Sequence, residues 1–325
     1  MSSSDSSLSP AQNSVAVVMA SMNAEDTIGR AVRSALAQPE AVQVIVIDDG
    51  SNDATATAAM AADDGSGRLE VLSLPQNRGP SAARNIALER VTAEWFTILD
   101  SDDFMDEDRL SRMLAAGKDE HDFIADDLWV VQEGEEDGLR SVLWDKNDPS
   151  VRKSMTLEYF IRSNMPHPER PRRELGFIKP LIRMSTLRRL DLSYDETMRL
   201  NEDFDLYCRL LADGIPALLT EPMGYVAVRR SDSLSARHDH NALRALYKCA
   251  LDLQKLPGLS RSETDALEEY RAMTSRRYRW PWLIHALKTR KIKEVVSCFS
   301  TSPDVILHLL GKILETGLTK ASRQR

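Results

Sequence analysis

Residues 42–53 have the sequence VQVIVIDDGSND, and this stretch gives the clearest indication of the fold. Val42–Ile47 is rich in β-branched residues, which favours a buried β-strand. Two adjacent carboxylates, Asp48 and Asp49, follow in a polar turn. Carboxylates at a strand end can accept hydrogen bonds from a nucleobase or a ribose, but a capped turn at the start of a helix uses the same residue types. Both interpretations can hold together, so we assign Asp49 to a ligand and Asp53 to helix capping or to the helix dipole.

Strands and helices alternate on both sides of this stretch. Short apolar segments predict strands over Ser14–Ala20, Leu69–Leu74 and Trp95–Leu99. Segments with helical periodicity of apolar residues predict helices over Ala24–Gln38, Asp53–Ala62 and Pro80–Val91. Such alternation implies right-handed βαβ units and a mostly parallel sheet with helices on both faces. The predicted fold class is therefore α/β, and ligands should bind beyond the carboxyl ends of the strands.

The rest of the chain is less regular. We expect short strands within Asp122–Asp145 and Phe177–Arg183, a helix over Asn201–Asp213, and mainly helices from Asn241 onward. The predicted organisation is a disordered lead-in at residues 1–13, an α/β domain at 14–238 and a helical extension at 239–325.

Composition excludes several classes of protein. The 325 residues are 42% apolar and 28% charged, which is ordinary for a globular chain. A net charge of −8 argues against general nucleic-acid binding. Three scattered cysteines cannot form a disulfide framework, so a reducing, cytoplasmic compartment is the simplest interpretation. No apolar run approaches the roughly 20 residues that span a bilayer, and the N-terminus has no secretory signal.

The charge is divided between an acidic body and a basic tail. From Arg271 to Arg325 there are 12 basic and three acidic residues, a net charge of +9, so the remainder carries −17. Apolar residues in this tail recur at helical spacing. One interpretation is a set of helices packed on the body with a solvated basic face. The other is peripheral contact with an anionic membrane, where each nearby Lys or Arg contributes about 1 kcal/mol.

The acidic run DSDD at residues 100–103 follows the predicted strand Trp95–Leu99. Two unit charges 4 Å apart repel by about 4 kcal/mol at an effective dielectric constant of 20, so converging carboxylates need a cation, protons or water. Hard oxygen ligands suit Mn²⁺ or Mg²⁺. We therefore expect Asp100 and Asp102 at a ligand or metal site, and Asp106–Asp108 in the first turn of the next helix, where acids favour the helix dipole.

Three further segments carry candidate residues. Arg78 or Arg84, around a helix that begins at Pro80, can pair with a diphosphate, although surface ion pairs are the commoner role. Of Glu202 and Asp203, one is a candidate general base, or both serve the helix dipole. The strand-to-helix turn at 20–25 has no GxGxxG and the chain has no GxxxxGK[ST], so NAD-type and P-loop sites are disfavoured.

Five segments in this order resemble glycosyltransferase family 2, the inverting nucleotide-sugar enzymes with the GT-A fold. They are SVAVVMASMNAEDTI (14–28), VIVIDDGSND (44–53), NRGPSAARNIAL (77–88), ILDSDD (98–103) and NEDFDLYCRL (201–210). The regions around 229–238 and 280–298 also look like bacterial exopolysaccharide glucosyltransferases of the succinoglycan type. The resemblance departs at Ala20 and Met22, where the family often has Pro and an aromatic residue.

The resemblance implies roles for particular residues. A uridine pocket would be lined by Ser21, Asn23, Asp48 and Asp49, and Arg84 would help to hold the donor. Of the acidic run, Asp100 would lie near the ribose, with Ser101 beside it, and Asp102 would bind a metal, Mn²⁺ or Mg²⁺, that bridges the diphosphate. Asp203 would be the base that deprotonates the acceptor, and His238 would close on the diphosphate and metal. Separately from the resemblance, Trp129, Trp144, Phe177 and Lys179 are candidates for the acceptor site, although core packing is the commoner role of an aromatic residue.

The implied activity is inverting transfer of a hexose, with UDP-glucose as the expected donor, to a saccharide or lipid-linked oligosaccharide acceptor. Inversion of a UDP-α-sugar would give a β-linkage. Two alternatives remain, a sugar-nucleotide nucleotidyltransferase and a non-catalytic protein that binds nucleotide sugars. The first normally has a Gly-rich, basic N-terminal loop, which residues 20–25 do not provide.

Overall fold

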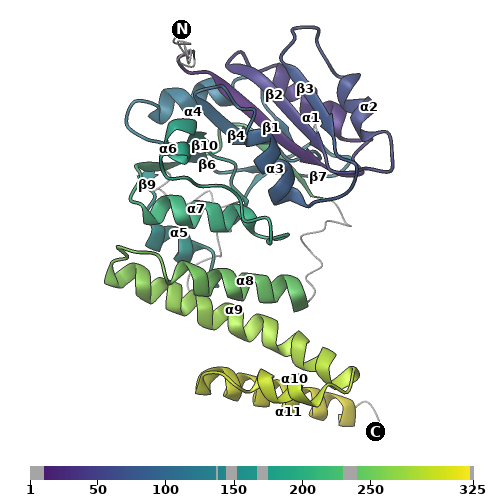
Figure 1. Ribbon diagram of the computed structural model, residues 1–325, viewed down its shortest axis with the longest axis vertical. Coiled ribbons are helices and arrows are strands. Elements are labelled where there is room, and N and C mark those ends of the chain that lie inside the picture. Colours follow the sequence, from purple (N-terminus) through teal and green to yellow (C-terminus); the bar gives the residue numbers. More distant parts are fainter. Residues whose placement is uncertain (1–10, 137, 144–151, 167–174, 230–239, 323–325) are drawn as a thin grey trace, which may run out of the picture. The chain divides into compact units, whose positions relative to one another are not determined.

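The computed structural model describes residues 11–136, 138–143, 152–166, 175–229 and 240–322 (Figure 1). The chain divides into two compact units, residues 1–231 and 232–325. Most of the predicted lead-in, the predicted domain boundary at residue 238 and the candidate Trp144 lie outside the described residues. Among the helices described, none combines the length and the apolar character needed to cross a membrane.

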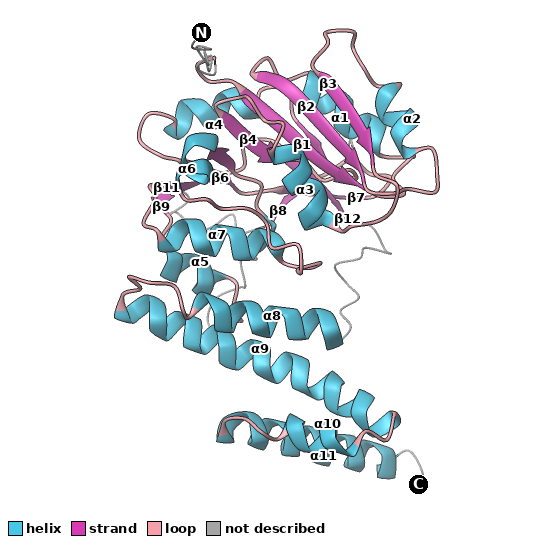
Figure 2. Ribbon diagram, viewed as in Figure 1, coloured by secondary structure: helices cyan, strands magenta, loops and turns pink. Residues whose placement is uncertain are grey.

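A mixed eight-stranded sheet forms the centre of the first unit (Figure 2). In spatial order its strands are β3 (Leu69–Ser73), β2 (Ala41–Asp48), β1 (Val15–Ser21), β4 (Trp95–Ile98), β10 (Leu181–Arg183), β6 (Phe123–Asp126), β11 (Ala217–Thr220) and β9 (Lys153–Ser154). The first four strands pair in parallel, as does β6 with β11, whereas β10 and β9 are antiparallel to their neighbours. The four strands predicted in the first hundred residues are confirmed to within one residue at each end.

Helices cover both faces of this sheet, as predicted. They are α1 (Ile28–Leu36), α2 (Thr55–Met60), α3 (Pro80–Leu88), α4 (Arg109–Gly117), α5 (Leu157–Ser163), α6 (Met184–Arg189) and α7 (Glu202–Ala212), with a 3₁₀ turn at Leu175–Phe177. The first helix begins four residues later than predicted. The N–H of Ile28 donates to the carbonyl of Ala24 at 2.9 Å, and the backbone N–H groups of Ala24 and Glu25 donate to the side chains of Thr55 and Asp53.

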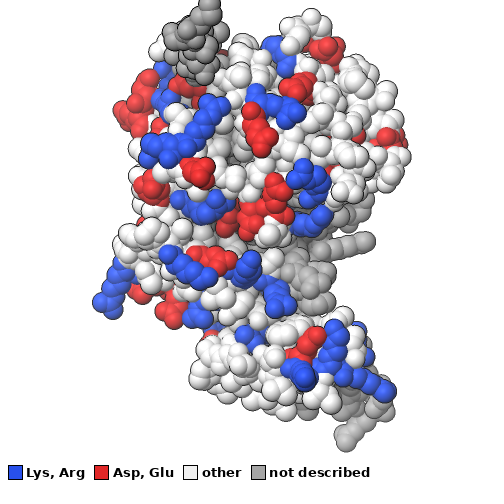
Figure 3. Space-filling model, in the orientation of Figure 1, with Lys and Arg blue, Asp and Glu red and all other residues white. Residues whose placement is uncertain are grey.

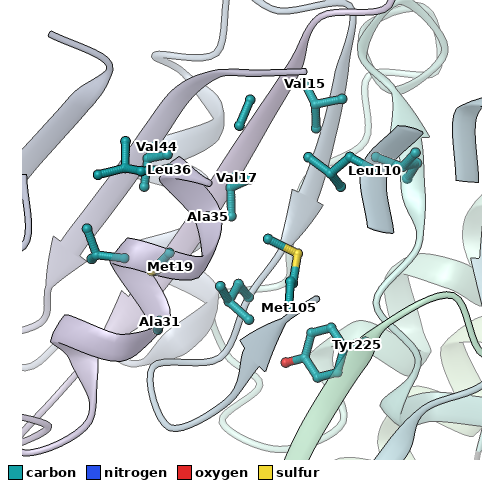
Figure 4. Close-up of a cluster of buried hydrophobic side chains, with 14 of the residues drawn as sticks. Val15, Val17, Met19, Ala31, Ala35, Leu36, Val44, Met105, Leu110 and Tyr225 are labelled. Atoms are coloured by element: carbon teal, nitrogen blue, oxygen red, sulfur yellow. The ribbon is translucent and has the colours of Figure 1, made fainter. Parts of the chain in front are cut away.

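The main hydrophobic core lies between the sheet and α1 (Figure 4). Alternate residues of β1, Val15, Val17 and Met19, are fully buried and point to this side. They pack with α1 residues spaced for one helix face, including Ala31 and Ala35. The alternate residues of β1 and one face of α1 thus form a single apolar layer. The polar residues that follow the strands lie outside it, at the edge of the sheet.

A smaller sheet completes the first unit. Its order is β5 (Phe104–Met105), β12 (Tyr225–Arg229), β7 (Trp129–Gln132) and β8 (Ser141–Val142). The prediction that Asp106–Asp108 form a first helical turn is wrong, because α4 begins at Arg109. Asp106 instead follows β5 and accepts two hydrogen bonds from Arg140, and the backbone N–H of Asp106 donates to the carbonyl of Gly224 in the segment before β12.

Helices make up the described part of the second unit, as predicted. They are α8 (His240–Leu253), α9 (Arg261–Lys288), α10 (Ile292–Cys298) and α11 (Pro303–Ser322). A capping box at Ser260 and Glu263 begins α9. Buried Leu283, Cys298 and Leu309 join the last three helices in a small core.

Gly50 is required where the turn after β2 approaches the next loop. Its φ is +75°, and a Cβ there would lie 2.6 Å from the backbone nitrogen of Asn77 and 2.6 Å from the carbonyl carbon of Gln76. We expect Gly50→Ala to lower the free energy of unfolding by about 2–4 kcal/mol, since it combines a left-handed backbone with a backbone clash. Gly65→Ala is the matched control, because Gly65 has the same φ of +75° with nothing within 4 Å. Equal losses for both variants in urea unfolding would contradict the close-approach argument.

Candidate active site

The carboxyl ends of β1, β2 and β4 meet at one edge of the large sheet because these strands are parallel. Ser21 ends β1 directly opposite Asp48, the last residue of β2. The backbone N–H of Asp49 donates to the carbonyl of Ser21 at 2.8 Å. Residues 100–103 follow β4 at the same edge. The structure therefore brings together the polar strand ends that were predicted to share a site.

The turns after β1 and β2 are tied to each other. The backbone N–H of Asn23 donates to Ser51 Oγ at 2.9 Å, and Asn23 Oδ1 accepts from the N–H of Asn52 at 3.0 Å. Asn23 has a φ of +50°, a conformation that Asn tolerates better than most residues. Asp48 Oδ1 accepts from the N–H of Ser51 at 3.2 Å. The two turns thus form one connected rim.

Asp49 holds the neighbouring loop in place. Its side chain is buried, and it accepts from the backbone N–H groups of Arg78 at 2.7 Å and Gly79 at 2.8 Å, and from Asn77 Nδ2 at 2.9 Å. Asp49 therefore positions the start of α3. Asp49 Oδ2 accepts two of these bonds and Oδ1 accepts one, so a ligand group would have to share Oδ1 with the loop.

A buried guanidinium lies at the centre of the site. Arg84 on α3 is only 5% exposed and reaches three carboxylates from distant parts of the chain. Its Nη2 lies 3.3 Å from Asp100 Oδ1, its Nη1 lies 3.1 Å from Asp203 Oδ1, and Nη1 also pairs with Glu202. Arg84 thereby joins α3, the loop after β4 and the start of α7.

Lys179 forms the second bridge of this cluster. Its Nζ lies 3.0 Å from Asp100 Oδ2 and 3.0 Å from Asp203 Oδ2, and it is 4% exposed. The hydroxyl of Tyr194 donates to Asp203 Oδ1 at 3.1 Å. Both oxygens of Asp203 are therefore occupied. Lys179, expected at the acceptor site, lies between the two key carboxylates, whereas Phe177 is 42% exposed.

The start of α7 concentrates negative charge where the helix dipole favours it. Glu202, Asp203 and Asp205 lie in the first turn. Asn201 precedes them with a φ of +58° and makes no side-chain cap. Asp205 pairs with Arg209 one turn later, so only Glu202 and Asp203 take part in the buried cluster.

Mutual charge stabilisation sets the ionisation of the cluster. Burial opposes the charge on Asp100, but Lys179 and Arg84 outweigh it and hold the pKa of Asp100 below its usual value. Burial likewise opposes the charges on Lys179 and Arg84, yet the nearby carboxylates raise both of their pKa values. Burial and the charge of Asp203 raise the pKa of Tyr194, which keeps its hydroxyl as a donor.

Asp103 anchors the acidic loop to the smaller sheet. Its Oδ2 accepts from the Tyr225 hydroxyl at 2.7 Å and its Oδ1 from the N–H of Val228 at 2.8 Å. Burial, together with the charges of Asp100 and Asp102, raises the pKa of Asp103 well above its usual value. Carboxylates are thus crowded enough in this loop to oppose one another's ionisation.

The acidic loop fits a divalent cation that is shared with a substrate. The chemistry of the set is right, because crowded carboxylate oxygens are the ligands that Mg²⁺ and Mn²⁺ prefer. No group of three or more His, Cys, Asp or Glu side chains in the described segments is arranged to hold a metal alone. Mg²⁺ sites often use one or two carboxylates and complete the shell with substrate phosphates and water. Asp102 is half-buried at this loop, and the predicted ligand His238 lies outside the described residues.

Sequence reasoning missed Tyr194, Tyr225 and Asp103 as parts of the site. Asp103 contacts Tyr225 and Val228, 122 and 125 residues away, and Tyr194 contacts Asp203 nine residues away. No local pattern marks a lone tyrosine as the partner of a distant carboxylate. The DSDD run was itself the only available signal for Asp103.

Comparison with known proteins agrees with this geometry. The model of the family described as Glycosyl transferase family 2 matches residues 16–181. The succinoglycan biosynthesis protein ExoU of Rhizobium meliloti (strain 1021) is 42% identical over 79% of this chain and 73% of its own length. ExoO of the same organism, also a succinoglycan biosynthesis protein, is 32% identical over 91% of this chain and 83% of its own. The chain belongs to glycosyl transferase family 2, and it is a glycosyltransferase.

Solved structures identify the fold as GT-A. The crystal structure of S. aureus TarS 1–349 in complex with UDP-GlcNAc superimposes with a TM-score of 0.63, at 18% identity, over 91% of this chain and 81% of that one. Mannosyltransferase PcManGT from Pyrobaculum calidifontis, in complex with GDP-Man and Mn²⁺, has a TM-score of 0.55 at 17% identity, over 94% and 80% of the two chains. The GT-A fold predicted for this chain is thereby confirmed.

Removing the central cation should destabilise the first unit. Arg84→Met leaves three carboxylates with one cation in a largely buried place, so we expect a loss of about 3–5 kcal/mol in the free energy of unfolding, measured with urea. Arg78→Met is the control, because Arg78 is 46% exposed and pairs with Glu196 at the surface. Its loss should stay below about 1 kcal/mol. A loss for Arg84→Met no larger than that of the control would contradict the central role of the guanidinium.

Proposed function

We propose that the chain is an inverting hexosyltransferase of exopolysaccharide synthesis, of the succinoglycan type. It transfers a hexose from a UDP-sugar, with UDP-glucose as the expected donor, to a saccharide or lipid-linked saccharide acceptor. The observation that carries the proposal is the pairing of Asp100 and Asp203 through Arg84 and Lys179 at the carboxyl edge of the sheet. The names of ExoU and ExoO support the pathway, and the UDP-GlcNAc complex of TarS supports a UDP-sugar donor.

The rim formed by the first two turns is the proposed nucleoside site. Ser21, Asn23 and Asp48 offer side-chain oxygens there, and Asp49 holds the adjoining loop. Met22, 45% exposed, takes the position where an aromatic residue was noted as missing. A thioether can contact the face of a base in place of an aromatic ring.

The acidic loop and the two buried cations form the proposed diphosphate and ribose site. Asp100 and Ser101 would face the ribose, and Asp102 would hold Mn²⁺ or Mg²⁺, with His238 as a further ligand. The bound metal supplies charge neutralisation for the leaving diphosphate. Arg84 and Lys179 are the two positive charges that the protein itself supplies there.

Asp203 is the proposed general base, and its hydrogen bonds define what must change before catalysis. A base must accept a proton at a free lone pair, and Arg84, Lys179 and Tyr194 already take three of the four lone pairs of the Asp203 carboxylate, leaving one on Oδ2. A diphosphate near Asp100 would compete for both cations. If Arg84 and Lys179 moved partly away from Asp203, Asp203 could accept the proton of the acceptor hydroxyl. The acceptor would then attack from the side opposite the leaving group.

The proposal includes peripheral contact of the C-terminal extension with the cytoplasmic face of the membrane. A lipid-linked acceptor would place the reaction there, and the net charge of +9 on residues 271–325 favours an anionic surface.

Replacing the base should separate chemistry from binding. We expect Asp203→Asn to lower kcat by about 10³-fold, because the amide cannot accept the proton, while UDP still binds in calorimetry. Asp205→Asn is the matched control, since Asp205 lies in the same helical turn but pairs with Arg209. Glu202→Gln distinguishes the two acids of the cluster. Near-normal transfer by Asp203→Asn with loss in Glu202→Gln would move the base to Glu202.

Metal removal should weaken donor binding. We expect UDP and UDP-glucose to bind with Mn²⁺ and to lose about tenfold or more in affinity with a chelator, because the metal links Asp102 to the diphosphate. Asp102→Asn should remove most of this metal dependence, whereas Asp108→Asn, a change at the exposed N-cap of α4, should leave it intact. Full activity after exhaustive metal removal would contradict the metal role, and binding of GDP-sugars alone would contradict the choice of donor.

A further inference from the structure

The end of α9, the turn after it and the start of α10, residues 287–293 with the sequence LKTRKIK, are exposed along their whole length. It carries four cations, Lys288, Arg290, Lys291 and Lys293, and no acid. Figure 3 shows basic side chains on the visible face of the last helices beside uncharged surface. We call residues 287–293 together with Val296 the basic corner.

Most of this charge is not neutralised within the described part of the chain. Lys291 pairs with Glu294 at 3.0 Å. Within the described residues, Lys288, Arg290 and Lys293 form no ion pair with a carboxylate. Three positive charges are therefore available to an anionic partner.

Large aliphatic side chains lie among these cations. Leu287 is 53% exposed, Ile292 is 77% exposed and Val296 is 66% exposed. Ile292 and Val296 are four residues apart and share one face of α10. Binding that removes these aliphatic groups from water lowers the free energy of the system.

The basic corner is displayed on a packed scaffold. Arg290 adopts a φ of +55°, and the N–H of Lys291 donates to the carbonyl of Ala286 at 2.9 Å, which closes the turn. Beneath it, Arg279 donates to the carbonyls of Ser297 and Cys298, each at 2.9 Å. The exposed side chains therefore belong to an ordered turn.

The last helix exposes a second apolar stripe. Val305 and Leu309 of α11 are buried against the small core of the unit. Leu307, Leu310 and Leu314 lie on the opposite face and are 68%, 45% and 67% exposed. At spacings of three and seven residues they form one line along the helix. The second unit thus leaves large aliphatic side chains of α11 exposed, in addition to those of the basic corner.

We propose that the basic corner docks on an anionic phospholipid surface, with Leu287 and Ile292 entering the headgroup boundary and Lys288, Arg290 and Lys293 contacting the lipid phosphates. The inference rests on the membrane contact in the proposed function and names its surface and partner. Cations interleaved with aliphatic groups fit a bilayer interface, which offers both negative charge and an apolar layer. A symmetric dimer through the basic corner would bring like charges together, and a nucleic acid would leave the aliphatic groups in water.

The test measures binding of the full chain to phosphatidylcholine vesicles with and without phosphatidylserine. We expect binding only to the anionic vesicles. The variant Lys288→Gln, Arg290→Asn, Lys293→Gln should bind about 100-fold more weakly, which is about 1 kcal/mol for each cation. Asn is used at position 290 because it tolerates the left-handed backbone. The matched control, Arg33→Gln, Arg112→Gln, Arg189→Gln, removes three exposed cations of the first unit and should bind as the wild type does.

A second variant tests the apolar contribution. Leu287→Gln, Ile292→Gln should weaken vesicle binding about tenfold or more, whereas Val42→Gln, Met60→Gln, at exposed positions of the first unit, should not. The proposal would be overturned by equal binding to neutral and anionic vesicles, or by an equal loss of binding in the control variants. It would also be overturned if the chain were a dimer that Leu287→Gln, Ile292→Gln converts to a monomer without changing vesicle binding. Transfer to a soluble acceptor is measured separately. Its absence would contradict the proposed function without affecting the lipid result.

Discussion

The ion cluster around Arg84 is the constraint on which the rest of the site depends. Three carboxylates and two cations meet where water has little access, and each charge is tolerable only because the others are present. Arg84 and Glu202 are 118 residues apart in the sequence, so the cluster forms only when α3 and α7 are both in place. A single missing partner would leave an uncompensated charge in the protein interior.

The same cluster explains how this edge of the sheet can carry so many acidic side chains. Its three carboxylates exceed its two cations by one charge. The smaller sheet restrains the acidic loop from the other side, because Tyr225 and Val228 hold the Asp103 carboxylate. The protein's own contacts therefore order the loop, while its negative charge favours a cation. Under the proposed mechanism, the donor and its metal complete an electrostatic arrangement that the protein leaves unbalanced.

Sequence patterns were sufficient for the parts of the fold that repeat locally. β-Branched runs predicted β1 to β4 within a residue, and the polar ends of those strands predicted where the site would lie. Patterns failed where a long-range contact decides the outcome. Asp106–Asp108 look like a helical first turn, but Asp106 is held by Arg140 and by the carbonyl of Gly224, so the helix starts later. Lys179 was expected at the acceptor site but bridges Asp100 and Asp203, and no local pattern marks Tyr194 as a hydrogen-bond donor to Asp203.

The resting arrangement of Asp203 has a consequence for the proposed reaction. A transferase must avoid passing its sugar to water, and an exposed, unpaired base beside the donor would activate water as readily as an acceptor hydroxyl. In this structure Asp203 is 6% exposed and receives three hydrogen bonds. Under the proposed mechanism, the base becomes available only as the donor diphosphate draws Arg84 and Lys179 away. Buried ion pairs add little to net stability once the cost of removing their charges from water is counted. Restricting when Asp203 can accept a proton therefore explains the cluster better than stability alone.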